Sequence, residues 1–190
     1  MKSIELFAGA GGLALATANA GFHHTAVFEW NSNACATLRR NQALGSPHLR
    51  NAQIIEGDIA HYEFCPYLGE VELVSGGPPC QPFSMGGKHG GMDDERNMFP
   101  HAIRAVREIR PKAFIFENVK GLLRESFANY YQYIIHQLKQ AKSDWDVVHP
   151  GRSWADKCKG KTPSRKEIVA GVDAFLSRLG KPASQISIGQ

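Results

Sequence analysis

Residues 4–12, IELFAGAGG, join a short apolar run to a turn built from small residues. The Ala- and Leu-rich stretch 13–20 follows with high helix propensity and ends at Gly21. A strand, a tight glycine turn and a helix in this order are typical of nucleotide-binding α/β folds, because the turn lets a ligand approach the backbone closely. The same pattern also fits a turn that serves only packing.

The alternation of strand-like and helical segments continues through residues 1–121. The apolar runs that predict further strands are 24–28, 54–55, 71–74 and 113–116. The periodic segments that predict helices are 34–41, 98–109 and 127–138. We therefore predict an α/β fold, a mostly parallel sheet with helices on both faces. All strand ends then lie along one edge, where open α/β sheets bind ligands.

The length and charge of the chain limit its class. A chain of 190 residues with net charge +4 suffices for one α/β domain, and a mildly basic balance permits nucleic acid as a partner without indicating it. The chain has no apolar stretch of about 20 residues for a membrane span and no room for a signal peptide, so we expect a cytoplasmic protein. The four cysteines lack zinc-knuckle spacing, and we expect free thiols.

Acidic and aromatic residues follow the second and third predicted strands. Glu29 stands where an acidic residue meets ribose hydroxyls in folds of this type, and Trp30 beside it could stack on an adenine. Asp58 ends the third strand and could accept a hydrogen bond from an exocyclic amine. Each residue alone fits a solvated strand-end acid or a core aromatic equally well. Together, in this order, they favour an adenosine-bearing cofactor.

Residues 75–84, SGGPPCQPFS, place one thiol among three prolines and two glycines. These residues leave the loop little conformational freedom. Cys80 on such a loop, at the ligand edge, is badly placed for packing, which would suit Cys35 better. As a thiolate it could act as a nucleophile.

Glu117 and Asn118 end the next strand-like run. Neighbouring strands lie about 5 Å apart, so if these two strands pair, Glu117 can face whatever Cys80 attacks. A carboxyl partly buried between apolar neighbours would have a raised pKa and could donate a proton near neutrality. An ordinary strand-end salt bridge is the alternative interpretation of Glu117.

Four stretches together resemble the DNA cytosine-5 methyltransferase family of bacterial restriction–modification systems. They are residues 5–12 (ELFAGAGG), 77–84 (GPPCQPFS), 94–97 (DERN) and 117–122 (ENVKGL), in family order and at family spacing. The resemblance implies the Rossmann-like fold of methyltransferases that depend on S-adenosylmethionine (AdoMet), with AdoMet as methyl donor and duplex DNA as partner.

The resemblance also implies individual roles. Cys80 would attack C6 of a cytosine flipped out of the duplex, Glu117 would protonate N3, and Asn118 would shape the pocket. The residues implied to hold AdoMet are Phe7, Ala8, Gly9, Gly11, Gly12, Glu29, Trp30, Asp58, Ile59, Pro79 and Phe99. The residues implied to contact DNA are Gln81, Ser84, Gly86 and Lys88, within a loop over 84–91 that would close on the DNA. No metal is expected.

The pattern of alternating strand-like and helical segments ends near residue 140. We expect a partial AdoMet-binding catalytic domain over 1–140, a linker or loop over 141–163, and a C-terminal helix and tail over 164–190, with residues 145–148 a candidate sixth strand. The family's later Gln-x-Arg-x-Arg motif and target recognition domain are not found. The sheet should then be incomplete at its C-terminal end, and the chain inactive or nearly so without a second polypeptide that carries the recognition domain.

Three other functions stay open. The first is an AdoMet-binding fragment without catalysis, and the second an RNA cytosine-5 methyltransferase with the same nucleophile. The third is a nicotinamide-dependent dehydrogenase. It accounts for the glycine turn and Glu29 but leaves the loop over 75–84 without a purpose.

Overall fold

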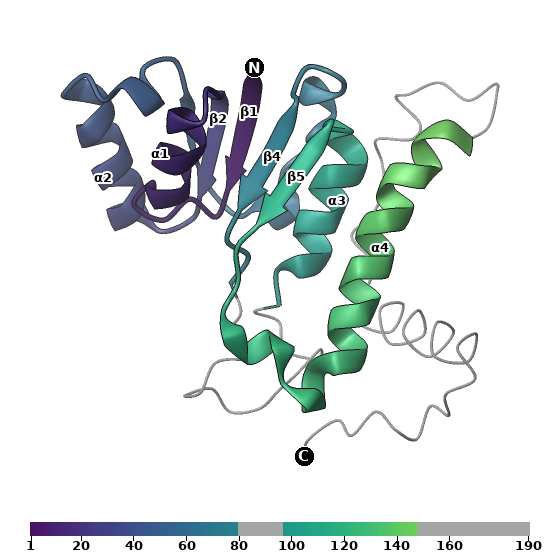
Figure 1. Ribbon diagram of the computed structural model, residues 1–190. Coiled ribbons are helices and arrows are strands. Elements are labelled where there is room, and N and C mark those ends of the chain that lie inside the picture. The colour runs from purple at the N-terminus through teal and green to yellow at the C-terminus, as the bar shows by residue number, and fades with distance from the viewer. Residues whose placement is uncertain (80–96, 148–190) are drawn as a thin grey trace.

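The architecture is taken from a computed structural model, which describes residues 1–79 and 97–147, the last six of these as backbone only. Within these ranges a five-stranded sheet has the order β3-β2-β1-β4-β5, and every neighbouring pair is parallel (Figure 1). The strands are β1 (Lys2–Leu6), β2 (His23–Glu29), β3 (Gln53–Glu56), β4 (Leu73–Gly76) and β5 (Ala113–Phe116). The predicted parallel sheet is confirmed.

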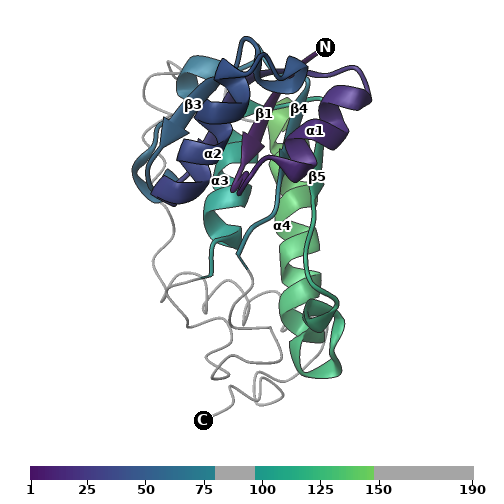
Figure 2. The ribbon, with the colours of Figure 1, turned by 90° about the vertical axis from the view of Figure 1, so that its left-hand side faces the viewer.

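Helices cover both faces of the sheet, as predicted (Figures 1 and 2). They are α1 (Gly12–Asn19), α2 (Ser32–Ala43), α3 (Phe99–Ile109) and α4 (Ala128–Val147). Strand alternation explains the two layers, because Val27 packs with Leu38 of α2 while Phe28 packs with the residues of α3 and α4. None of the helices in the described part of the chain is long and apolar enough to cross a membrane.

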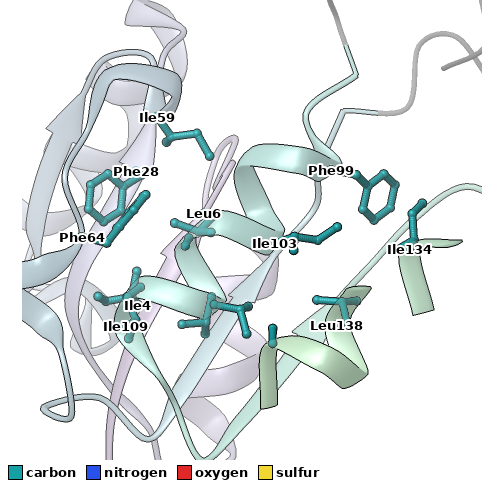
Figure 3. Close-up of a cluster of buried hydrophobic side chains, with 14 of the residues drawn as sticks. Ile4, Leu6, Phe28, Ile59, Phe64, Phe99, Ile103, Ile109, Ile134 and Leu138 are labelled. Carbon is teal, nitrogen blue, oxygen red and sulfur yellow. The ribbon is translucent and has the colours of Figure 1, made fainter. Parts of the chain in front are cut away.

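The larger core lies between the sheet and the helices α3 and α4 (Figure 3). The predicted stripe of α3 (Phe99, Ile103, Val106 and Ile109) is at most 5% exposed, which confirms its helical periodicity. Figure 3 shows Ile103 and Phe99 facing Leu138 and Ile134 of α4. This packing holds the start of α3 beside the strand ends.

The last helix is longer than the sequence predicts. We expected a linker or loop over 141–163 and a candidate strand over 145–148, but α4 continues to Val147, so the loop is wrong for residues 141–147 and the strand for residues 145–147. The stretch 139–147 contains no glycine or proline, and the first helix-breaking residue after it is Pro150. The expected linker over 148–163 and helix over 164–190 lie outside the described residues.

Glu5 is a buried acid at the centre of the sheet. Its side chain is 1% exposed and accepts a hydrogen bond from the Ser75 hydroxyl of β4, the strand that pairs with β1 at this position. Its second oxygen, Oε1, has no hydrogen-bond partner among residues 1–79 and 97–147. Burial raises the pKa of Glu5 to about 7, and the Ser75 hydrogen bond only partly opposes this.

We predict that Glu5 makes the free energy of unfolding fall as the pH rises from about 4.5 to about 7. In this window the unfolded chain loses the proton while the folded chain keeps it, so deprotonation favours unfolding; the full effect is about 3 kcal/mol. Urea denaturation at several pH values should show this slope in the wild type. This fall in the free energy of unfolding should be absent in Glu5→Gln. The same slope in both proteins would contradict the prediction.

Candidate active site

A cavity of about 360 Å³ opens at the carboxyl ends of β1 to β4. This volume lies within the range of small-molecule sites. It is lined by Phe7, Phe28, Glu29, Trp30, Gly57, Asp58, Ile59, Gly77, Pro79 and Met98. The chain leaves β3 at one edge of the sheet and returns at β4 on the other side of β1, so the cavity lies at the topological switch point, where ligands of open α/β sheets bind.

Several residues predicted to hold a cofactor line this cavity: Phe7, Glu29, Trp30, Asp58, Ile59 and Pro79. Others do not: Ala8, Gly9, Gly11, Gly12 and Phe99. Phe99 is 3% exposed and belongs to the hydrophobic core, while its neighbour Met98 lines the cavity in its place. The cavity is also lined by Met98, Phe28, Gly57 and Gly77, which the sequence does not predict. Phe28, Gly57 and Gly77 stand at strand ends, which is the one signal that could have indicated them, whereas Met98 precedes α3.

The Glu29 carboxylate joins the glycine turn to the end of β2. Its Oε2 accepts a hydrogen bond from Gly9 N at 2.7 Å, and its Oε1 accepts from Trp30 N at 2.9 Å and Asn31 N at 2.8 Å. The residue is 8% exposed, so these three backbone donors compensate for the removal of the charge from water. Oε2 accepts one of them, which leaves it a lone pair for a further donor.

The glycines of the turn shape the backbone beside the cavity but do not line the cavity. Gly11 has φ +95°, and a Cβ there would lie 2.9 Å from Leu38 Cδ2, so this position requires glycine. Gly9 also has a positive φ and presents its N–H to Glu29. Ala8 is 7% exposed and packs in the smaller core beside α2. The turn therefore positions the wall of the cavity, and its glycines do not line it.

Phe7 adopts an unusual backbone conformation. It has φ +54°, which costs a non-glycine residue on the order of 1 kcal/mol. The Phe7 ring packs against the larger core and lines the cavity. This packing explains how the backbone tolerates the strain, and a β-type sequence run gives no signal of it.

The far wall of the cavity comes from the segment after β3. Asp58 is exposed, and its Oδ1 accepts a hydrogen bond from Ala60 N at 2.8 Å, which caps the short 3₁₀ helix over Ile59–His61. Ile59 is 4% exposed and packs in the core. Trp30, at the end of the neighbouring strand β2, is 75% exposed. An apolar ring and a carboxyl group therefore stand at the mouth of the same cavity.

Glu117 and Asn118 lie against the segment that leads to Cys80. β4 and β5 pair in parallel, with Gly76 opposite Phe116, and Glu117 N donates to Gly76 O at 3.0 Å. Asn118 Nδ2 donates to Pro78 O at 3.0 Å, and a Cβ on Gly77 would lie 3.3 Å from Glu117 Oε2. These two strands therefore pair, which is the condition on which the prediction for Glu117 depended. The expected partial burial of Glu117 is wrong, because the residue is exposed.

Cys80 and the candidate DNA-contacting residues Gln81, Ser84, Gly86 and Lys88 lie outside the described residues. Pro79, the residue before Cys80, lines the cavity. Cys35 is a buried free thiol, as expected of a packing residue. Cys65 is disulfide-bonded, so the expectation of free thiols is wrong at this position.

A family model described as C-5 cytosine-specific DNA methylase matches residues 1–148. The type II methyltransferase M.NgoMIV of Neisseria gonorrhoeae is 46% identical over 135 residues, which cover 71% of this chain and 41% of the relative. M.PspPI of Psychrobacter sp. is 44% identical over 72% of this chain and 31% of its own length, and M.NaeI of Lentzea aerocolonigenes is 38% identical over 78% and 35%. The chain therefore spans less than half of these relatives.

Solved structures agree on the fold. A DNA modification methyltransferase encoded within a prophage, from E. coli, superposes with a TM-score of 0.57 at 27% identity, over 74% of this chain and 38% of that chain. The DNMT2 of Spodoptera frugiperda gives 0.53 at 23% identity, over 74% and 41%. The predicted Rossmann-like methyltransferase fold is confirmed.

A second, shorter family match begins near the end of the first. A model described as Eco29kI GIY-YIG domain matches residues 136–176. This range contains the change in sequence character that we note after residue 140. The match to the methylase model covers most of the chain, including the glycine turn, the loop over 75–84 and the end of β5. The chain therefore belongs to the C-5 cytosine-specific DNA methylase family.

Proposed function

We propose that this chain supplies the AdoMet-binding and catalytic part of an enzyme that methylates carbon 5 of cytosine in duplex DNA, as part of a restriction–modification system. The observation that carries the proposal is the meeting of two features at one sheet edge. The cavity beside Glu29 ends at Pro79, and Glu117 and Asn118 contact the same Gly77–Pro79 segment from the neighbouring strand.

The cavity suits the adenosine part of AdoMet. The free lone pair of Glu29 Oε2 could accept a hydrogen bond from a ribose hydroxyl, and the exposed Trp30 ring could stack on the adenine. Asp58 at the far wall could accept from the exocyclic amine. The family membership supports AdoMet as the methyl donor. Bound AdoMet supplies a methyl group on a positively charged sulfur.

The residues around the cavity then have distinct roles. Carbon 5 of cytosine is a poor nucleophile until a group adds at C6, so the Cys80 thiolate attacks C6 while Glu117 donates a proton to N3. The electron-rich C5 would be the atom that accepts the methyl group supplied by bound AdoMet. A base then removes the C5 proton, the C6–S bond breaks to release the Cys80 thiolate, and N3 returns its proton to Glu117. Asn118, bonded to Pro78 O, holds the Glu117 strand end against the Cys80 loop.

Complete activity requires more than this part of the chain. The relatives are more than twice as long as the matched region, so a second polypeptide that carries a target recognition domain is a candidate partner. Base edges must be contacted by such a domain, since sequence is read in the grooves. The proposed DNA contacts from Gln81, Ser84, Gly86 and Lys88 would place the flipped base near Cys80.

Trp30→Ala tests the cofactor site. Loss of the Trp30 ring should weaken AdoMet binding about tenfold, because stacking on one base contributes about 1–3 kcal/mol. Isothermal titration calorimetry on the isolated chain gives the affinity. Leu44→Ala is the matched control, because Leu44 is 76% exposed against 75% for Trp30 and does not line the cavity. Equal affinities in the two variants would exclude Trp30 from the site.

Cys80→Ser tests the nucleophile. The chain, with and without the candidate second polypeptide, is incubated under reducing conditions with AdoMet and DNA that contains 5-fluorocytosine. A fluorine at C5 prevents the final elimination, so the wild type should form a covalent adduct and Cys80→Ser none. Cys158→Ser is the control, since Cys158 lies beyond the methylase match.

Three outcomes of the trapping assay separate the alternatives. An adduct with Cys80→Ser at the wild-type level would remove Cys80 from its role. AdoMet binding without any wild-type adduct would favour a cofactor-binding fragment. An adduct with 5-fluorocytosine in tRNA and none with DNA would favour the RNA methyltransferase.

A further inference from the structure

We propose that Arg104 and Glu108 of α3 are positioning residues that hold the Asp58–Ile59 wall of the cofactor cavity in place. This inference rests on the proposed function, because the cavity is taken to bind AdoMet. Neither side chain lines the cavity. Both act on the backbone of the segment that follows β3.

The Arg104 guanidinium is bound mainly to main-chain carbonyls. Its Nη2 donates to Ile59 O at 2.5 Å, and its Nη1 donates to Tyr62 O at 2.9 Å and to Glu108 Oε1 at 2.9 Å. The residue is 8% exposed, so its charge has little access to water. Two carbonyls of one short turn therefore meet one rigid, planar cation.

Glu108 fixes the other end of the same segment. Its Oε2 accepts a hydrogen bond from Phe64 N at 3.0 Å, while its Oε1 holds Arg104. The Arg104 guanidinium also lies 5.4 Å from the centroid of the Phe64 ring. With a longer hydrogen bond from Arg104 Nη2 to Ala60 O at 3.5 Å, the pair binds the backbone over Ile59–Phe64 at four points from a helix that is itself firmly packed.

The segment held in this way forms part of the cavity at two places. Ile59 lines it directly, and Phe28, another lining residue, packs its ring against Tyr62 at 4.7 Å and Phe64 at 5.2 Å between centroids. Figure 3 shows Ile59 and Phe64 beside Phe28. A shift of the segment would therefore move Asp58, Ile59 and the Phe28 ring together.

The geometry favours a positioning role over simple stabilisation. A buried ion pair contributes little net stability, because desolvation offsets the attraction, and apolar side chains would pack as well. Here both charged groups bond to main-chain atoms of one segment, so their contacts specify where that segment lies. α3 begins at Phe99, next to the lining residue Met98, so one helix places two walls of the cavity.

Arg104→Lys and Glu108→Gln test the inference. Lysine has a single nitrogen, which cannot reach Ile59 O, Tyr62 O and Glu108 together, and glutamine removes the charge that holds Arg104. Each should raise the dissociation constant for AdoMet about tenfold, the equivalent of one lost hydrogen bond to a charged group. Without ligand, hydrogen exchange should accelerate in the amides of residues 58–64.

Arg107→Lys is the matched control on the same helix. Arg107 donates to Gln137 Oε1 of α4, and neither residue lines the cavity. This variant should keep the wild-type affinity and the wild-type exchange over residues 58–64, even where its thermal midpoint falls. Affinities are compared at a temperature well below all midpoints.

The outcomes are distinct. Wild-type affinity and wild-type exchange in Arg104→Lys and Glu108→Gln, with only a lower midpoint, would overturn the positioning role and leave the proposed function intact. Failure of the wild-type chain to bind AdoMet would overturn the proposed function and this inference with it. If Arg104→Lys does not fold, Glu108→Gln decides, because Phe64 N–H can still donate to the amide oxygen of its side chain.

Discussion

The site depends on the buried carboxylate of Glu29, which accepts hydrogen bonds from the backbone of Gly9, Trp30 and Asn31. A carboxylate out of water is stable only when donors surround it, and here all three are main-chain N–H groups. The same contact that satisfies the charge fixes the glycine turn against the end of β2 and the start of α2. Phe7 and Trp30, which line the cavity at the ends of β1 and β2, are thereby held in place.

The Asp58–Ile59 wall of the cavity is also held by a buried charge that binds main-chain atoms, in this case a cation. Arg104 is a buried cation whose partners are carbonyls of the segment after β3, and Glu108 adds the N–H of Phe64. Ile59 and Phe64 anchor this segment in the core, and a rigid side chain from a packed helix additionally defines where its backbone lies. Charged groups that bind main-chain atoms thus give two loops fixed positions around one cavity.

The register of the sheet places Glu117 and Asn118 beside the segment that leads to Cys80. Gly76 permits the close approach of β1 and β4, since a Cβ there would lie 2.5 Å from Leu6 O. β5 then pairs with β4 so that Glu117 and Asn118 follow directly beside Gly77 and Pro78. The methyl donor's cavity and the acid of the proposed reaction therefore share one short segment, the one that continues into Cys80.

The sequence alone determined the elements, because apolar periodicity is local: the strands, the buried stripe of α3 and the placing of Glu29, Asp58 and Glu117 at strand ends could all be predicted. Only the tertiary structure decided which residues meet. The conformation of Phe7, the lining by Gly57, Gly77 and Met98, the exposure of Glu117 and the contacts of Arg104 depend on segments far apart in the sequence; Arg104 and Ile59, for example, are 45 residues apart. Such contacts form only when strands align and helices pack, and no local pattern specifies them.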